Sequence, residues 1–190
     1  MPPDVAVSSA APAHLLALLA SHLPSSLTLL RRLQSAARGI GTSPGARVFF
    51  ISDDDDDVFT AAYADVSPGA DAQTFIFSTV QNTARAEDGS RNAAQLTALL
   101  GALARLSEDV DCRRTNFLLG SLHSDVRALL EPSGRLLPRP SGLYDKWLFD
   151  VSCLPPVEDR LPKGMHWGRA TLDDCVTVVS RSNIPRTPWA

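Results

Sequence analysis

A hydroxyl and an imidazole lie two residues apart in the stretch Gly120-Ser-Leu-His123. Such a pair can serve nucleophilic or acid–base catalysis when the imidazole reaches the hydroxyl. The stretch follows a predicted buried strand, and sheets with parallel strands often place their sites at the carboxyl ends of strands. It lacks a Gly-x-Ser-x-Gly elbow, however, and both side chains lie on nearly the same piece of backbone. The pattern favours a turn that enters a helix, with Ser121 and His123 as secondary catalytic candidates.

Metal ligands are the next possibility, and the acidic run at residues 53–57 is the most conspicuous cluster. Adjacent side chains on an extended segment point to alternate faces, so these carboxylates cannot all converge on one ion. The run also lacks the Asp-x-Asp-x-Asp-Gly spacing of a calcium loop. His14 and His22 are too far apart for a paired metal motif on one helix. We therefore predict a solvated hairpin tip at residues 53–57 and no metal site.

The cysteines indicate neither a disulfide framework nor a zinc site. Cys112, Cys153 and Cys175 are odd in number and far apart, and the sequence has no C-x-x-C pair. Cys112 and Cys175 adjoin predicted helix residues and have no histidine nearby in the sequence, so we interpret them as small apolar fillers. This use of cysteine is typical of a reducing compartment.

Composition describes an ordinary globular chain of 190 residues, slightly more than one domain of about 150. The hydrophobic fraction of 44%, the charged fraction of 21% and a mean hydropathy of −0.02 fit one sizeable core. A net charge of −3 and a pI near 5.7 argue against nucleic acid or an anionic membrane as a partner. The N-terminus has no Lys or Arg before Arg31, and its best apolar run, residues 15–20, is far too short for a membrane span. We expect a soluble, cytoplasmic protein.

Hydrophobic periodicity predicts the elements that would position these groups. Leucines at helical spacing from Leu15 to Leu33 predict two helices, which meet at Pro24 because proline interrupts a helix. Three β-rich runs are separated by segments rich in Asp, Gly and Pro. They predict an antiparallel meander of strands at residues 47–51, 58–66 and 74–80.

The clearest helix in the sequence follows the meander. Leu96, Leu99, Leu103 and further residues up to Val110 form one apolar stripe, and Ser90 is the expected N-cap. A strand, a helix and another strand complete the order, at residues 115–120, 124–130 and 144–151. Alternating strands and helices of this kind predict an α/β fold with a mixed sheet and helices on both faces.

Proline-rich and polar segments divide the chain into parts. In the last part we predict a strand at residues 165–170 and a helix from Thr171, which forms an acidic variant of a capping box with Asp174. A strand and one helix cannot bury a core, so this part resembles the beginning of a second domain. The expected parts are a flexible arm (1–12), a main lobe (13–152), a linker (153–162) and the incomplete start of a second lobe (163–190).

Several short stretches, spread over most of residues 13–188, form a recognisable pattern. They are His22-Leu-Pro24, Leu29-Leu-Arg-Arg-Leu-Gln34, Phe59-Thr-Ala-Ala-Tyr63, Tyr144-Asp-Lys-Trp-Leu-Phe149, Leu161-Pro-Lys-Gly-Met-His-Trp-Gly168, Asp174-Cys175 and Ser180-Arg-Ser-Asn-Ile-Pro-Arg186. Together with the element order, which lacks only a first strand, the pattern resembles the GNAT superfamily of acyl-CoA-dependent N-acyltransferases. It is most similar to a fungal, glycine N-acyltransferase-like group with two GNAT-like lobes in tandem. The resemblance implies an amine acceptor and an acyl-CoA site in the second lobe.

The resemblance also implies where a first lobe would hold the CoA pyrophosphate, namely a backbone nest with the fingerprint Gln/Arg-x-x-Gly-x-Gly/Ala at a helix start. The equivalent stretch here, Arg85-Ala-Glu-Asp-Gly89-Ser90, has one residue too many before its glycine and no second small residue where one is needed. Glu87 and Asp88 would add negative charge beside the phosphates. We therefore predict a degenerate loop, in which Arg85, Gly89 and Ser90 bind no cofactor. A general acid is implied near Ser121 and His123.

These observations lead to one main functional hypothesis and two others. We expect the N-terminal lobe of a GNAT-type N-acyltransferase, which shapes the acceptor pocket for a small amine and has little turnover alone. Acetyl-CoA or another acyl-CoA is implied for the family and not for this chain. The alternative is a non-catalytic interaction module that uses residues 161–190 and the sheet edge left by the missing strand. A third possibility is a reading frame that continues past Ala190.

Overall fold

The computed structural model describes residues 3–53, 57–66, 73–82, 89–109, 118–137, 151–153, 161–166 and 168–182. The chain divides into two compact units, Met1–Leu136 and Leu137–Ala190, which are described separately below. Within the described ranges, none of the helices combines the length and the apolar character that a membrane span requires.

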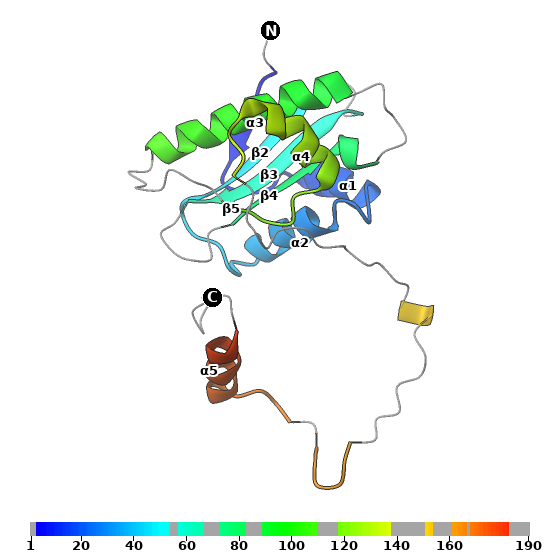
Figure 1. Ribbon diagram of the computed structural model, residues 1–190, viewed down its shortest axis with the longest axis vertical. Helices are drawn as coiled ribbons and strands as arrows, with labels where there is room; N and C mark the ends of the chain where they lie inside the picture. Colours follow the sequence, from blue (N-terminus) through cyan, green and yellow to red (C-terminus); the bar gives the residue numbers. More distant parts are fainter. Residues whose placement is uncertain are drawn as a thin grey trace. The chain divides into compact units, whose positions relative to one another are not determined.

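A mixed sheet with the strand order β1-β2-β3-β4-β5 forms the centre of the first unit (Figure 1). The strands from β1 to β4 pair antiparallel, and β5 runs parallel to β4. The predicted meander and the α/β mixed-sheet class are therefore confirmed. The strands are β1 (Ala6–Ser8), β2 (Ala46–Ser52), β3 (Phe59–Asp65), β4 (Gln73–Ser78) and β5 (Leu118–Leu119).

The strand β1 corrects the prediction of a flexible arm at residues 1–12. Val7 lies opposite Phe49 in an antiparallel pair, so the first strand, which was missing from the predicted element order, is present. A segment of three residues is too short to show the alternation of a strand, and its Pro-, Ala- and Ser-rich neighbours look like a loop. The sheet edge on which the interaction-module hypothesis partly relied is covered by β1.

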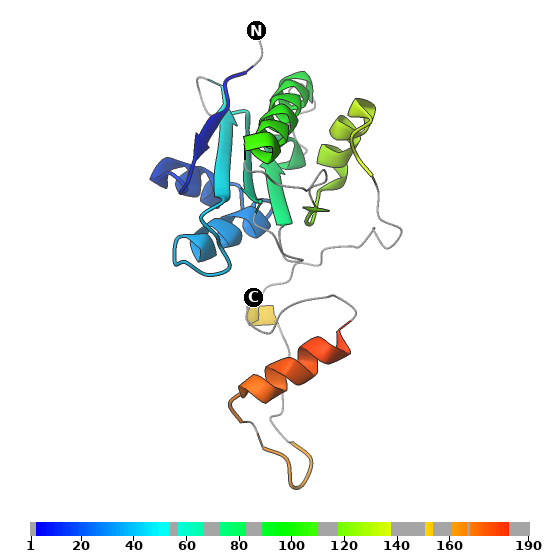
Figure 2. The same cartoon turned by 90° about the vertical axis from the view of Figure 1, so that its left-hand side faces the viewer.

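Helices cover both faces of this sheet (Figure 2). Side chains of alternate strand residues point to opposite faces, so Val48 and Ala61 face one helix pair, whereas Phe49 and Ala62 face the other. With helices on both sides, every residue of β3 is buried. One pair is α1 (Ala13–Ser21) and α2 (Leu27–Ala36), and the other is α3 (Gly89–Asp109) and α4 (Ser124–Leu130).

The predicted helices are confirmed, with shifts at their ends. Pro24 lies in the turn between α1 and α2, and the buried hydroxyl of Ser26 donates to the Leu19 carbonyl, which ties the two helices together. In α3 the stripe residues Leu96, Leu99 and Leu103 are buried. Ser90 is not the N-cap, because α3 already begins at Gly89. Val110 lies outside the described residues.

The fourth predicted strand is partly confirmed. Of residues 115–120, Leu118 and Leu119 form β5, and Gly120 continues the ladder by donating its amide to the Thr74 carbonyl at 2.8 Å. Both β5 residues are half-buried, not buried as expected. Ser121 has a φ of 51°, which turns the chain away from the sheet before α4 begins. Most of the strand predicted at 144–151 lies outside the described residues, and its last residue begins the short helix η4 (Val151–Cys153).

In the second unit, α5 (Leu172–Arg181) confirms the helix predicted from Thr171. The Thr171 hydroxyl accepts from the Asp174 amide at 3.3 Å, and the Asp174 carboxylate accepts from the Thr171 amide at 2.7 Å. These two bonds make the expected capping box. Hydrogen bonds from the Thr171 hydroxyl and amide hold the pKa of Asp174 below its usual range.

The strand predicted at 165–170 is wrong. The described residues there form no strand, and the Met165 amide donates to the Pro162 carbonyl at 2.9 Å across a turn that contains Gly164 at φ +89°. A strand requires a ladder partner, and no described residue pairs with this segment. The interpretation of Cys175 as an apolar filler is also wrong, because it is exposed on α5. Cys153 is exposed, and Cys112 lies outside the described residues.

Candidate functional site

The candidate site is the end of the sheet where β3 begins and β4 ends. Three features of the first unit meet there: the turn between α1 and α2, the end of β4 with the short helix η1 (Thr79–Asn82), and the first turns of α3. In addition, β4 pairs with β5 only through Gln73 and Thr74. Beyond Thr74, the described part of β5 offers β4 no further partner, so the second half of β4 is paired on its β3 side alone.

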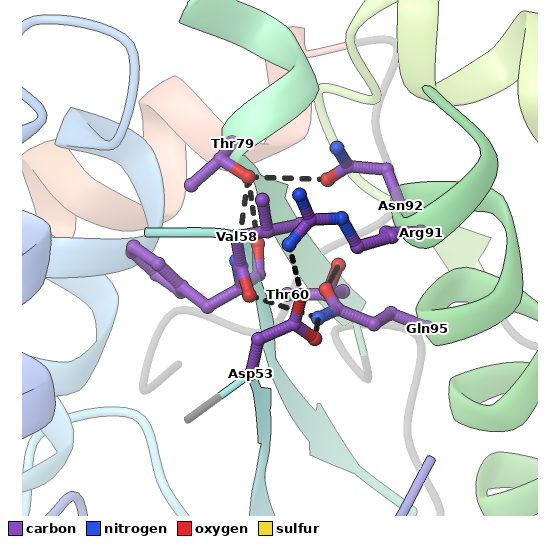
Figure 3. A network of polar contacts seen from close by, with 8 residues as sticks. Asp53, Val58, Thr60, Thr79, Arg91, Asn92 and Gln95 are labelled. Carbon is purple, nitrogen blue, oxygen red and sulfur yellow. Dashed lines mark hydrogen bonds and ion pairs between the residues drawn. The ribbon is translucent and has the colours of Figure 1, made fainter. Parts of the chain in front are cut away.

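A chain of polar contacts fastens α3 to this end of the sheet (Figure 3). Its centre is Gln95, which is 1% exposed. The Gln95 amide nitrogen donates to the Val58 carbonyl at 2.9 Å and to Asp53 Oδ1 at 3.1 Å, and its amide oxygen accepts from Thr60 at 3.1 Å. One side chain of α3 therefore bonds to the end of β2 and to the start of β3.

Asn92, one turn earlier in α3, makes the corresponding contacts to β4 and η1. Its amide oxygen accepts from the Ser78 hydroxyl at 2.6 Å and from the Thr79 hydroxyl at 3.1 Å. Ser78 is fully buried, and its oxygen lies 3.1 Å from the Thr60 hydroxyl oxygen, which joins this group to the Gln95 contacts. Buried polar groups are expensive unless they are paired, so this connected network fixes the position of α3 over the strand ends.

Asp53 corrects the prediction of a solvated hairpin tip. Its carboxylate accepts from Arg91 Nη1 at 2.9 Å and from Gln95, so it is bound to the first turns of α3. The side chain of Arg91 is 58% exposed, which leaves this ion pair largely open to solvent. Asp57 is exposed as expected, and residues 54–56 lie outside the described residues. The only cation in the first turn of α3 is thus already paired with an acid of this chain.

His22 lies in the α1–α2 turn, above the aromatic side chains at the same end of the sheet. Its ring meets Phe59 edge-on with centroids 5.2 Å apart, and it meets Phe77 at 5.7 Å. Both phenylalanines are almost fully buried. Partial burial lowers the pKa of His22, because an apolar setting disfavours the charged imidazolium. His22 therefore carries a neutral imidazole at neutral pH, which can accept a proton or a hydrogen bond.

The lowered pKa of His22 predicts a pH dependence of stability. Below its unfolded pKa of about 6.5 the unfolded chain binds a proton more readily than the folded one, so the free energy of unfolding should fall as pH decreases from 7 to 5. Urea unfolding across this range would measure the effect. The H22Q variant should lose this part of the slope, whereas H14Q should keep it, although His14 meets Phe50 in a similar edge-on contact. Equal slopes in H22Q and the unmodified chain would contradict the assignment.

The two residues singled out from the sequence flank the turn after β5. His123 is the N-cap of α4: its Nδ1 accepts from the Asp125 amide at 3.3 Å and lies 3.7 Å from the Asp125 carboxylate. This is the predicted helix-entry turn. Ser121 is exposed. Of the three residues of the degenerate loop, Gly89 and Ser90 form the first turn of α3, and Arg85 lies outside the described residues.

Sequence reasoning did not identify the Asn92–Gln95 network or the aromatic contacts of His22. One signal was available: Asn92 and Gln95 continue the apolar stripe of α3 toward its N-terminus at helical spacing, and polar residues on such a stripe must find buried partners. For metals, the described part of the chain contains no group of three His, Cys, Asp or Glu side chains that could hold an ion.

Comparison with known proteins supplies the family. Residues 3–147 match the family described as the acyl-CoA N-acyltransferase verG N-terminal domain. No curated protein and no solved structure matches the chain. The mixed sheet with helices on both faces is consistent with the GNAT-like fold of such enzymes. Because the match spans most of the sequence, this chain belongs to the family of acyl-CoA N-acyltransferase verG N-terminal domains.

Proposed function

We propose that this chain is the acceptor-side domain of a GNAT-type enzyme that transfers an acyl group from acyl-CoA to an amine, and that it does not hold acyl-CoA by itself. The family supports acyl-CoA as the cosubstrate and an amine as the acceptor. The observation that carries the second part is the pairing of Arg91 with Asp53 at 2.9 Å in the first turn of α3.

The start of α3 is where such a fold would receive a pyrophosphate, because free amides and the helix dipole attract anions there. Here the cation of that turn is neutralised by Asp53, and Glu87 and Asp88 precede the helix in the sequence. Asp53, Glu87 and Asp88 outnumber Arg85 and Arg91 by one, so these residues carry a net negative charge, which repels a polyphosphate. The missing second small residue removes the close approach of the backbone as well.

Calorimetric titration of this chain with CoA and with acetyl-CoA tests the proposal. We expect no saturable binding in the micromolar range. In the D53N variant the side chain can still accept from Gln95, but the negative charge that pairs with Arg91 is removed, so CoA binding should become stronger than in the unmodified chain. D4N makes the same charge change at an exposed residue of the first unit and should leave CoA binding nearly unchanged. Micromolar binding by the unmodified chain would overturn the proposal.

We also propose a fungal, glycine N-acyltransferase-like protein with two lobes, acting in the cytoplasm. The main lobe would span residues 13–152, a linker 153–162, and residues 163–190 would belong to the second lobe, which would hold acyl-CoA. This division is supported by the family match, which describes an N-terminal domain and ends at residue 147. The capped helix α5 lies beyond that end.

The alternative of a non-catalytic interaction module is favoured by one observation on α5. Leu172, Cys175, Val176 and Val179 follow the i, i+3, i+4, i+7 spacing of an apolar stripe, yet α5 has no buried residue. Size-exclusion chromatography distinguishes the two functions: an interaction module that uses this stripe should self-associate, and a clean monomer would count against it.

A further inference from the structure

The strongest unexplained feature outside the candidate site is the environment of Arg32, at the opposite end of the sheet, where α2 ends and β2 begins. The Arg32 guanidinium lies 4.4 Å from the centroid of the Tyr63 ring, and its Nη2 donates to the Tyr63 hydroxyl at 2.9 Å and to the Gly41 carbonyl. These contacts hold a half-buried cation in one orientation.

No carboxylate of the described residues pairs with Arg32. Its Nε is buried without a hydrogen-bond partner, and Nη1 has no acceptor in the described part of the chain either. The sequence has four arginines and no acidic residue between Asp4 and Asp53. A charged group that is withdrawn from water is normally paired, so the missing counter-charge calls for an explanation.

The loop between α2 and β2 is shaped to admit the guanidinium. Gly41 has a φ of +60°, which favours glycine, and a Cβ added there would lie 2.9 Å from Arg32 Nη1, so a larger residue would displace the guanidinium. The Tyr63 hydroxyl donates to the Thr42 hydroxyl oxygen at 2.9 Å. The Thr42 hydroxyl proton has no acceptor among the described residues, and both Gly41 and Thr42 are exposed. A chain of two hydrogen bonds, from Arg32 to the Tyr63 hydroxyl and from there to Thr42, therefore ends at the surface in the Thr42 hydroxyl, whose proton is a free donor among the described residues.

We propose that Arg32 and the Thr42 hydroxyl form a binding site for an oxyanion, a carboxylate or a phosphate group, on the α2–β2 loop. Arg32 and Thr42 both contact the Tyr63 hydroxyl, which places the guanidinium and the Thr42 hydroxyl near each other, and donors of these two kinds suit such a group. Asp65 opposes binding, since it is buried nearby with its carboxylate accepting from the Ser43 hydroxyl at 2.6 Å. Arg47, which donates to the Pro44 carbonyl of the same loop, favours binding. With one opposing carboxylate, we expect affinity in the millimolar range.

The test follows the arginine Nε–H signals by NMR during titration with sodium acetate and, separately, sodium phosphate, at constant ionic strength. We expect the Arg32 signal to shift saturably with at least one of the two anions. The matched control is Arg31, its neighbour on α2, which is exposed and, among the described residues, donates to Gln34 alone, at 3.0 Å. The R31Q variant should keep the saturable shift of Arg32. A linear shift of equal size at Arg31 and Arg32 would show ionic screening and would overturn the site.

Two variants report on the donors. R32K keeps the charge but loses the planar fork, and T42V removes the terminal hydroxyl at an exposed position without changing the size of the side chain much. Each should weaken anion binding by about fivefold, the effect of one lost hydrogen bond, followed in both through the signals of the loop amides. T42V also removes the acceptor of the Tyr63 hydroxyl, so its circular dichroism spectrum is first compared with that of the unmodified chain to establish that it folds. An affinity for the anion that is unchanged in T42V would show that the Thr42 hydroxyl is no part of the site and would overturn the proposed pair of donors.

Discussion

The Q95L variant is expected to lower the free energy of unfolding by about 2–4 kcal/mol, because leucine fills the space of Gln95 but removes its three hydrogen bonds to the strand ends. Gln95 is 1% exposed and serves the Val58 carbonyl, Asp53 and the Thr60 hydroxyl. The Val58 carbonyl would keep only the Asp53 amide, at 3.1 Å, and the Asp53 carboxylate would keep only Arg91 among the contacts described above. Urea unfolding followed by circular dichroism measures the change.

The control for Q95L is R91A, which removes another partner of Asp53 from the same face of α3. The ion pair between Arg91 and Asp53 joins side chains that are 58% and 32% exposed, so water screens it, and its loss should cost less than about 1 kcal/mol. If R91A destabilised the chain as much as Q95L, the stability of this end would come from surface charge. The buried network would then not be what fixes α3 to the strand ends.

Helices and strands with a regular hydrophobic pattern were predictable from the sequence, and the contacts between distant elements were not. The stripe of Leu96, Leu99 and Leu103 repeats over several turns, so it predicted the helix α3 without any knowledge of the elements that pack against it. The bonds of Gln95 reach Thr60 and Asp53, which are 35 and 42 residues away. A single sequence does not pair residues over such distances, so the network became visible only in the folded chain.

Two short segments show that strands, too, depend on contacts with distant elements that the sequence alone does not reveal. Ala6–Ser8 was predicted as a flexible arm but forms β1, whereas residues 165–170 were predicted as a strand but contain a turn. Local propensity is weak for so few residues, and the outcome depends on whether a ladder partner is present. Phe49 provides one for Val7. The candidate loop at residues 85–90 was judged by its glycine spacing and charges alone, and the pairing of Arg91 with Asp53 adds a structural reason for the same prediction.

Replacing Phe59 should have the largest effect of any variant considered, because its ring joins the core of the first unit to the histidine of the candidate site. Phe59 is fully buried and lies against His22, Phe77 and Phe50, with ring centroids 5.2, 5.4 and 5.9 Å away. The F59A variant should lower the free energy of unfolding by about 3–5 kcal/mol, since it removes apolar contacts and leaves a cavity.

The same variant tests the origin of the lowered pKa of His22. Opening the aromatic contact admits water to the imidazole, so the pKa measured by NMR should rise toward about 6.5. F59L, which keeps most of the volume, should retain the fold and move this pKa less, and it serves as the readout if F59A does not fold. F50A is the matched control: Phe50 is only half-buried and contacts His14 instead of His22, so it should cost less stability and leave the pKa of His22 nearly unchanged. A pKa of His22 that moves equally in F50A and F59L would place the cause of the shift elsewhere than in the contact with Phe59.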